Sequence, residues 1–172
     1  MQHEWSGLSP EVRHCRAQRG RERERCYFEL MAVATFKAGL NYGVVNAKWD
    51  AIRDAFHWFD PSKVAAMGGG EIERIEADAR VIRSRRKIEG VVDNAHKMLE
   101  IEREHGGFAE WLDSMPDPET RIAGLHREFA FMGPSTAYYF LHYAGEDVPG
   151  WHEWAERHPE IMGWSRERAR HS

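Results

Sequence analysis

The residues with the clearest chemical potential are those at the junction of two predicted helices, within Phe-Ala-Phe-Met-Gly-Pro-Ser-Thr-Ala, residues 129–137. Proline is favoured at the first position of a helix, so the second helix should begin at Pro134. Such a start leaves backbone N–H groups unpaired at the positive end of the helix dipole, and these groups can bind phosphate. The candidate contacts to a nucleic-acid backbone are Gly133, Pro134, Ser135 and Thr136. A plain helix–helix connection is the alternative interpretation of the same residues.

Arginine clusters are the second feature with chemical potential. Arg80, Arg83, Arg85, Arg86 and Lys87 fall close together with no acid between them, although the formal net charge of the chain is −4. That total argues against broad wrapping by nucleic acid, but it leaves room for a local site. Arg83, Arg85 and Arg86 are therefore predicted phosphate contacts. The arginines of residues 13–25 and 166–170 are instead expected to lie on solvated helix faces or in a tail.

Helices must position these residues, because apolar side chains recur at helical spacing and no two-residue alternation persists. The longest predicted helix is 87–104, and the apolar positions between Val45 and Phe59 follow helical spacing throughout. Further helices are predicted from Arg23 to about residue 40, and over 62–67, 71–79, 108–112, 119–129 and 135–144, followed by an aromatic segment over 151–164. The predicted fold class is all-α, a compact multi-helix domain with a helix-hairpin-helix motif.

Length and composition predict one domain. The chain has 172 residues, of which 42% are hydrophobic and 30% charged, an ordinary globular balance. We expect an irregular N-terminal arm over residues 1–22, a helical domain over 23–164 and a basic tail over 165–172.

Cysteine usage and hydropathy indicate a cytoplasmic protein. Cys15 and Cys26 are too few for a disulfide framework, and free thiols in a reducing compartment are the simpler interpretation. No apolar run is long enough to span a membrane, and the first residues lack the apolar core of a secretion signal. A metal site built from both cysteines, His14 and His152 or His158 is an alternative, but the spacing matches no known zinc pattern. We therefore expect no metal, no cofactor and a monomer.

Six segments match the motifs of one known family in the right order. They are residues 36–42 (FKAGLNY, family FQAGLSW), 59–67 (FDPSKVAAM, family FDPxKVAxM), 71–75 (EIERI, family DVERL), 81–88 (VIRSRRKI, family IIRNRxKI), 93–95 (Asp-Asn-Ala, family NNA) and 131–138 (FMGPSTAY, family FVGPTTxY). On these residues the chain resembles the 3-methyladenine DNA glycosylase I family, within the helix-hairpin-helix DNA glycosylases. The resemblance covers roughly residues 27–145. The family's N-terminal segment and its zinc staple have no counterpart, which makes this chain a divergent member.

The resemblance implies an enzyme of base excision repair, a hydrolase that acts on double-stranded DNA with a damaged base. Such an enzyme flips a damaged, here alkylated, nucleotide into a pocket and hydrolyses its N-glycosidic bond. A lysine would be needed at the hairpin for β-lyase activity, and this chain has Ser135 there, so we expect a monofunctional glycosylase. The alternative is a DNA-binding or lesion-recognition module that kept the hairpin without the chemistry.

The family's base pocket maps onto Ala34, Lys37, Tyr42 and Tyr138. The family's base-recognising glutamate falls on Ala34, and its stacking tryptophan falls on Tyr42, which keeps an aromatic face. Lys37 stands where the family has glutamine, and Tyr138 follows the hairpin. A pocket without the glutamate should handle cationic 3-methyladenine poorly, so an altered base specificity is expected.

Two acids are candidates for stabilising the cationic sugar that forms as the base departs. Asp147 and Glu153 come just after the second hairpin helix, in a region where many helix-hairpin-helix glycosylases carry an aspartate. The alternative for both is a helix cap or a solvated loop acid.

Overall fold

The computed structural model describes residues 13–161, which form helices joined by short turns and contain no strand. This agrees with the all-α prediction. In chain order the helices are η1 (Cys15–Ala17), α1 (Gly20–Lys37), α2 (Tyr42–Ala47), α3 (Trp49–Ala55), η2 (His57–Phe59), α4 (Pro61–Ala65), α5 (Gly69–Ala77), α6 (Arg85–His105), α7 (Phe108–Asp113), α8 (Pro118–Glu128), α9 (Pro134–Ala144) and α10 (Trp151–Glu156).

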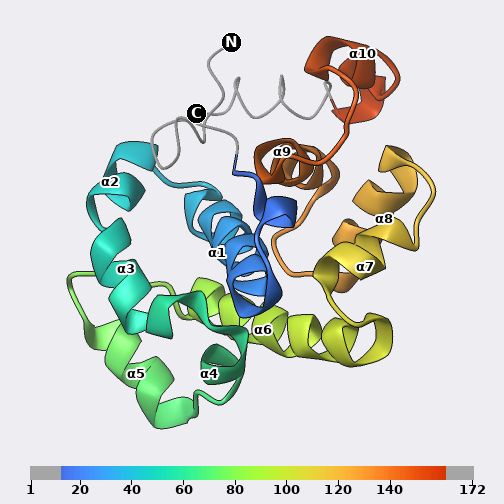
Figure 1. Ribbon diagram of the computed structural model, residues 1–172. Helices are drawn as coiled ribbons and strands as arrows, with labels where there is room; N and C mark the ends of the chain where they lie inside the picture. The colour runs from blue at the N-terminus through green and yellow to red at the C-terminus, as the bar shows by residue number, and fades with distance from the viewer. Residues whose placement is uncertain (1–12, 162–172) are drawn as a thin grey trace.

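Helices α1 and α6 form the centre of the molecule (Figure 1). Helices α2 to α5 lie on one side of them, and α7 to α10 lie on the other. The C-terminal half of α1 is buried almost all round, from Leu30 to Lys37. A helix that is apolar on all sides is typical of a core element, and α1 packs against α6, α9 and α4.

Helix α6 is the longest, as the sequence predicted. The Ser84 side chain caps its start by accepting from the Lys87 amide, and Gly106 ends it in the left-handed conformation, at φ 87°. Its buried face carries Ile88, Val91 and Ala95, which place one side of the helix in the core for several turns.

The apolar spacing predicted a single helix from Val45 to Phe59, but this stretch is not one helix. It divides into α2, α3 and η2, and His57, Trp58 and Phe59 all adopt positive φ angles of 52° to 56°. The turn brings the Phe59 ring to 5.5 Å from the Trp49 ring and 5.8 Å from the Phe56 ring, measured between centroids. Buried aromatic packing therefore outweighs the local cost of left-handed backbone.

The N-terminal segment corrects the prediction of free thiols. Cys15 and Cys26 form a disulfide with a Cα–Cα distance of 5.4 Å, and no free cysteine remains among the described residues. Cys15 is fully buried, and the Arg13 amide donates to the Tyr143 carbonyl at 2.7 Å. Helix α1 begins at Gly20, so the last residues of the predicted arm are helical. Residues 1–12 of that arm and the predicted basic tail lie outside the described residues.

Helix α10 ends at Glu156, within the aromatic segment 151–164 of the sequence, and residues 162–164 lie outside the described residues. None of the described helices is both long enough and apolar enough to cross a membrane.

Candidate nucleic-acid interface

The hairpin between α8 and α9 has the predicted geometry at its start. Phe131 takes a left-handed conformation, at φ 57°, and the extended Gly133 is the N-cap of α9, with Pro134 in the first turn. The Gly133 carbonyl accepts from the Ala137 amide at 2.8 Å, and no side chain caps the helix. The amides of Ser135 and Thr136 lie in the first turn, where an α-helix supplies no backbone partner.

Helix α6 holds the hairpin turn in place. The Asn94 side chain donates to the Ala130 carbonyl at 3.1 Å and accepts from the Ala130 amide at 2.8 Å. The Arg86 guanidinium lies over the Phe131 ring, 5.2 Å from its centroid, as a cation–π pair. Arg86, Ala130 and Phe131 border an open groove of about 430 Å³ between α6 and the turn, which is also lined by Gly90 and the acids Glu89 and Asp93. Arg86 is thus the predicted cation that the structure places beside the hairpin.

Arg85 and Lys87, two other cations of the 80–87 cluster, have partners within the protein. Arg85 pairs with Glu89 at 2.9 Å and with Glu76 at 3.2 Å, and these carboxylates raise the pKa of its guanidinium. Lys87 points inward, and its ammonium donates to the Phe36 carbonyl at 3.2 Å and to the Ala38 carbonyl. Arg83 is exposed. The phosphate contacts of Arg83 and Arg85 stay predictions.

The predicted pocket residues Ala34, Lys37 and Tyr42 lie on either side of the turn between α1 and α2. Ala34 and Lys37 lie one turn apart at the end of α1 and are buried, at 3% and 2% exposure. Tyr42 is half-buried and begins α2, which the Asn41 side chain caps by accepting from the Gly43 amide at 2.8 Å. The Lys37 ammonium lies 4.8 Å from the centroid of the Tyr42 ring. One positive charge therefore lies against the aromatic face predicted to stack on a base.

The two predicted acids, Asp147 and Glu153, follow α9 in the chain and make their contacts away from the α1–α2 turn. Asp147 is exposed in the loop after α9. Glu153 is exposed on α10 and pairs with Arg157 one turn along the helix. Neither residue has a contact with Tyr42 or with the hairpin that would establish a catalytic role, so both roles stay predictions.

Tyr138 has a packing role in this structure. Its hydroxyl donates to the Pro149 carbonyl at 2.7 Å, and its ring stacks on Trp154 with centroids 4.8 Å apart. Burial raises the pKa of its hydroxyl. These contacts fasten α9 to α10, and the predicted place of Tyr138 in the base pocket stays a prediction.

The most buried acid near the hairpin helices is Glu146, which the sequence interpretation passed over in favour of its neighbour Asp147. Its side chain is 3% exposed and accepts from the Tyr27 hydroxyl at 2.5 Å and from Arg16 at 2.9 Å, and Arg121 lies 3.7 Å away. Burial and the Glu146 carboxylate raise the pKa of Tyr27. The only local signal is Gly145, whose left-handed conformation, at φ 82°, ends α9 and turns Glu146 inward.

The residues do not fit the family's zinc staple. Both sulfur atoms are bonded to each other, and His158 lies between Glu119, at 2.9 Å, and Glu160, at 3.1 Å. Within residues 13–161, no three His, Cys, Asp or Glu side chains are grouped so that they could hold a metal ion.

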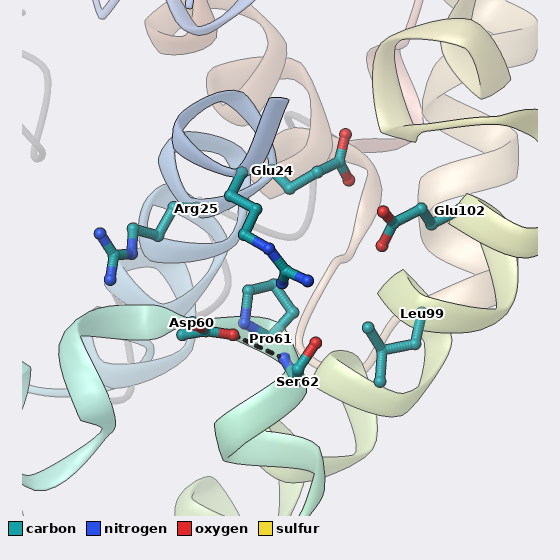
Figure 2. Close-up of a pocket in the computed structure, with 8 residues that line it drawn as sticks. Glu24, Arg25, Asp60, Pro61, Ser62, Leu99 and Glu102 are labelled. Atoms are coloured by element: carbon teal, nitrogen blue, oxygen red, sulfur yellow. Dashed lines mark hydrogen bonds between the residues drawn. The ribbon is translucent and has the colours of Figure 1, made fainter. Parts of the chain in front are cut away.

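A small cavity between α1, α4 and α6 is separate from the predicted site. Figure 2 shows the carboxylates of Glu24 and Glu102 pointing toward the same space, with Asp60 and Ser62 hydrogen-bonded at its edge. Its volume of about 20 Å³ suits a water molecule and excludes a base.

Comparisons with known proteins give the chain its relatives. A family model described as methyladenine glycosylase matches residues 17–127. DNA-3-methyladenine glycosylase 1 of Escherichia coli is 35% identical over 95 residues, which cover 55% of this chain and 51% of that protein. DNA-3-methyladenine glycosylase of Haemophilus influenzae is 29% identical over 139 residues, which cover 69% of this chain and 75% of that protein. The chain thus spans about half the length of the first relative and three quarters of the second.

Solved structures of 3-methyladenine DNA glycosylase I share the fold of this chain. A mutant 3-methyladenine DNA glycosylase I from Staphylococcus aureus superposes with a TM-score of 0.62 at 28% identity, covering 71% of this chain and 77% of that one. Another mutant glycosylase I, in complex with 3-methyladenine, gives a TM-score of 0.65 at 25% identity, covering 84% of this chain and 88% of that one.

Proposed function

The chain belongs to the methyladenine glycosylase family, and we propose that it is a monofunctional DNA glycosylase of base excision repair. The observation that carries the proposal is the family match over residues 17–127, well over half of the chain. The matched relatives are named as glycosylases, and one structural neighbour was solved with 3-methyladenine. The proposed substrate is double-stranded DNA that contains a damaged base.

The hairpin supplies the proposed grip on the DNA backbone. The first-turn amides of Ser135 and Thr136 offer hydrogen-bond donors and the positive end of the α9 dipole to a phosphate. Arg86, held over Phe131, adds a positive charge beside the same turn. This arrangement lets a chain with a net charge of −4 bind DNA through a short local contact.

Base release requires the flipped nucleotide to lie against the α1–α2 turn, where Tyr42 would stack on the base. The C1′–N bond breaks with its electron pair leaving on the base. A water oxygen then bonds to C1′, and the water proton goes to solvent or to the departing base. The intermediate sugar has cationic character, which a nearby carboxylate would stabilise. Asp147 is the proposed residue for that role, because Glu153 is held by Arg157.

The pocket wall predicts which bases are accepted. Ala34 offers a methyl group where a carboxylate would attract a cation, and the buried Lys37 ammonium lies against Tyr42. The substrate is therefore proposed to be an alkylated base that is neutral in the pocket, and cationic 3-methyladenine should be a poor substrate.

The test is release of free base from DNA duplexes that each carry one defined lesion, with the products identified by mass spectrometry. We expect release of a neutral alkylated base at a rate that falls in Tyr42→Ala and persists in Tyr42→Phe. Trapping with borohydride on abasic DNA should give no covalent adduct, since Ser135 cannot form a Schiff base. Faster release of 3-methyladenine than of every neutral lesion would contradict the proposed base preference.

A non-catalytic DNA-binding module is the second candidate. It is favoured by the methyl group at Ala34 and by the ion pair that occupies Glu153. If the protein binds the lesion-containing duplexes but releases no base from any of them, this candidate is supported over the enzyme. The monomeric state and the cytoplasmic location stay predictions.

A further inference from the structure

Helix α6 contacts both halves of the proposed site through one face. At its start, the Lys87 ammonium donates to the Phe36 and Ala38 carbonyls, which are the last carbonyls before the α1–α2 turn. Two turns further along, Asn94 holds the Ala130 amide and carbonyl of the hairpin turn. The two contacts lie seven residues apart, so they are separated by roughly 10 Å along a straight helix.

Both side chains hydrogen-bond to backbone groups, so they fix the positions of the two turns rather than of individual side chains. The C-terminal carbonyls of a helix have no partner in the helix itself, and a lysine is well suited to fill that place. Lys87 does this from a partly buried position, and burial lowers the pKa of its ammonium. Asn94 is 2% exposed and uses both its donor and its acceptor on one residue, which fixes that residue in two directions.

The helix between them is held in the core. Ile88, Val91 and Ala95 are buried on the same helix, and α6 packs against α1, α4, α5 and α7. A packed interior resists small shifts, so the spacing between the two turns cannot change without moving α6. The base-stacking turn and the DNA-gripping hairpin are therefore set relative to each other by one element.

We propose that Lys87 and Asn94 are positioning residues, Lys87 for the base-stacking turn and Asn94 for the phosphate-gripping hairpin. Each controls a different step of the reaction. Loss of Asn94 loosens the hairpin and weakens binding of DNA. Loss of Lys87 loosens the turn that carries Tyr42 and slows base release from DNA that is already bound. This inference rests on the proposed function for its affinity and kinetic parts, and the effect of each residue on the mobility of its turn does not.

The test separates the two steps with Asn94→Ala, Lys87→Met and a control, Arg103→Met, an exposed position on the same helix. Affinity is measured on a duplex with a tetrahydrofuran abasic analogue, and the single-turnover rate of base release is measured at saturating protein. Asn94→Ala should lose about tenfold in affinity, the value of a lost hydrogen bond or two, with the rate within about twofold. Lys87→Met should show the reverse, a rate loss of about tenfold with affinity nearly unchanged.

Amide hydrogen exchange provides a readout that does not depend on activity. Lys87→Met should speed exchange at residues 38–43 and leave 130–137 unchanged, and Asn94→Ala should do the opposite. If the unaltered protein releases no base but this exchange pattern and the affinity loss hold, the proposed enzyme fails and the positioning roles stand. Parallel losses of affinity, rate and thermal stability in both variants would show general destabilisation and overturn the proposal.

Discussion

The two ends of α1 are built in opposite ways. The N-terminal end is tied down by the Cys15–Cys26 disulfide, by the buried hydrogen bond from Tyr27 to Glu146 and by Glu24, which accepts from the Phe108 amide at 3.0 Å. The C-terminal end runs into a short turn in which Leu40 is exposed, and Val44 is exposed in the helix that follows. The difference indicates that covalent and polar links are concentrated at the N-terminal end of the central helix, whereas its C-terminal half is held by burial in the core. The other end is left to present the Tyr42 turn.

The largest expected effect is loss of the disulfide. Cys15→Ser should lower the free energy of unfolding by about 3 kcal/mol, because the bond closes a loop of eleven residues' separation in the unfolded chain. Urea unfolding with and without reductant measures this, with the exposed Ala17→Ser as control. Base release at a temperature where the variant stays folded should be unchanged. A fall in release in parallel with stability would erase the distinction between the two ends.

The next effect is at Glu146. Glu146→Leu should cost about 2 kcal/mol, because it leaves the buried Tyr27 hydroxyl without an acceptor and removes a partner from Arg16. The partly exposed Arg16 keeps Asp113 and solvent, which limits the loss. Glu146→Gln, which can still accept from Tyr27, should lose less. Equal unfolding midpoints for the Leu and Gln variants would show that the hydrogen bond contributes nothing.

At the opposite end, Tyr42→Ala should slow base release by about tenfold or more, the value of one stacked base. The free energy of unfolding should change little, since Tyr42 is only half-buried. Single-turnover kinetics and urea unfolding on the same preparation decide this. A variant that loses stability but keeps its rate would reverse the comparison.

The smallest effect concerns pH at the N-terminal end. Burial raises the pKa of Glu24 from its usual value of 4.5, against the hydrogen bond from the Phe108 amide, and nearby Glu102 adds to the rise. The unfolded chain therefore releases this proton at lower pH than the folded chain. The stabilising contribution of the protonated carboxyl is present below pH 4.5 and is lost as pH rises through the folded pKa. Glu24→Gln should be slightly more stable than wild type at neutral pH, and thermal unfolding should show the gap closing toward pH 4. A gap that does not change with pH would rule out this titration.

Elements with local signals could be predicted from the sequence. Ser84 and Gly106 mark the ends of α6, Asp117 caps α8 before a proline, and Gly133-Pro134 starts α9. Elements that depend on distant partners could not. The left-handed run at 57–59 depends on the packing of the Phe59 ring against Trp49 and against Phe28 of α1, and the apolar spacing of that stretch gave no sign of it.

The residues of the candidate site also separate into those with a local sequence signal and those that depend on distant partners. The Gly133–Thr136 turn was predicted because its signals are consecutive residues. Glu146 was missed because its partners Arg16 and Tyr27 are more than a hundred residues away in sequence. The free-thiol prediction failed because two cysteines in a chain state nothing about their separation in the fold, which here brings Cys15 against the first turns of α1.

The state of the disulfide also depends on the redox conditions in which the chain folds. A molecule folded among oxidants carries a closed covalent ring of residues 15–26, and one folded among reducing thiols carries the same residues as an open segment. The two forms differ in mass by only two hydrogen atoms, which intact-mass measurement of freshly extracted protein resolves. The oxidised fraction therefore reports the redox state of its compartment directly, without reference to any sorting signal.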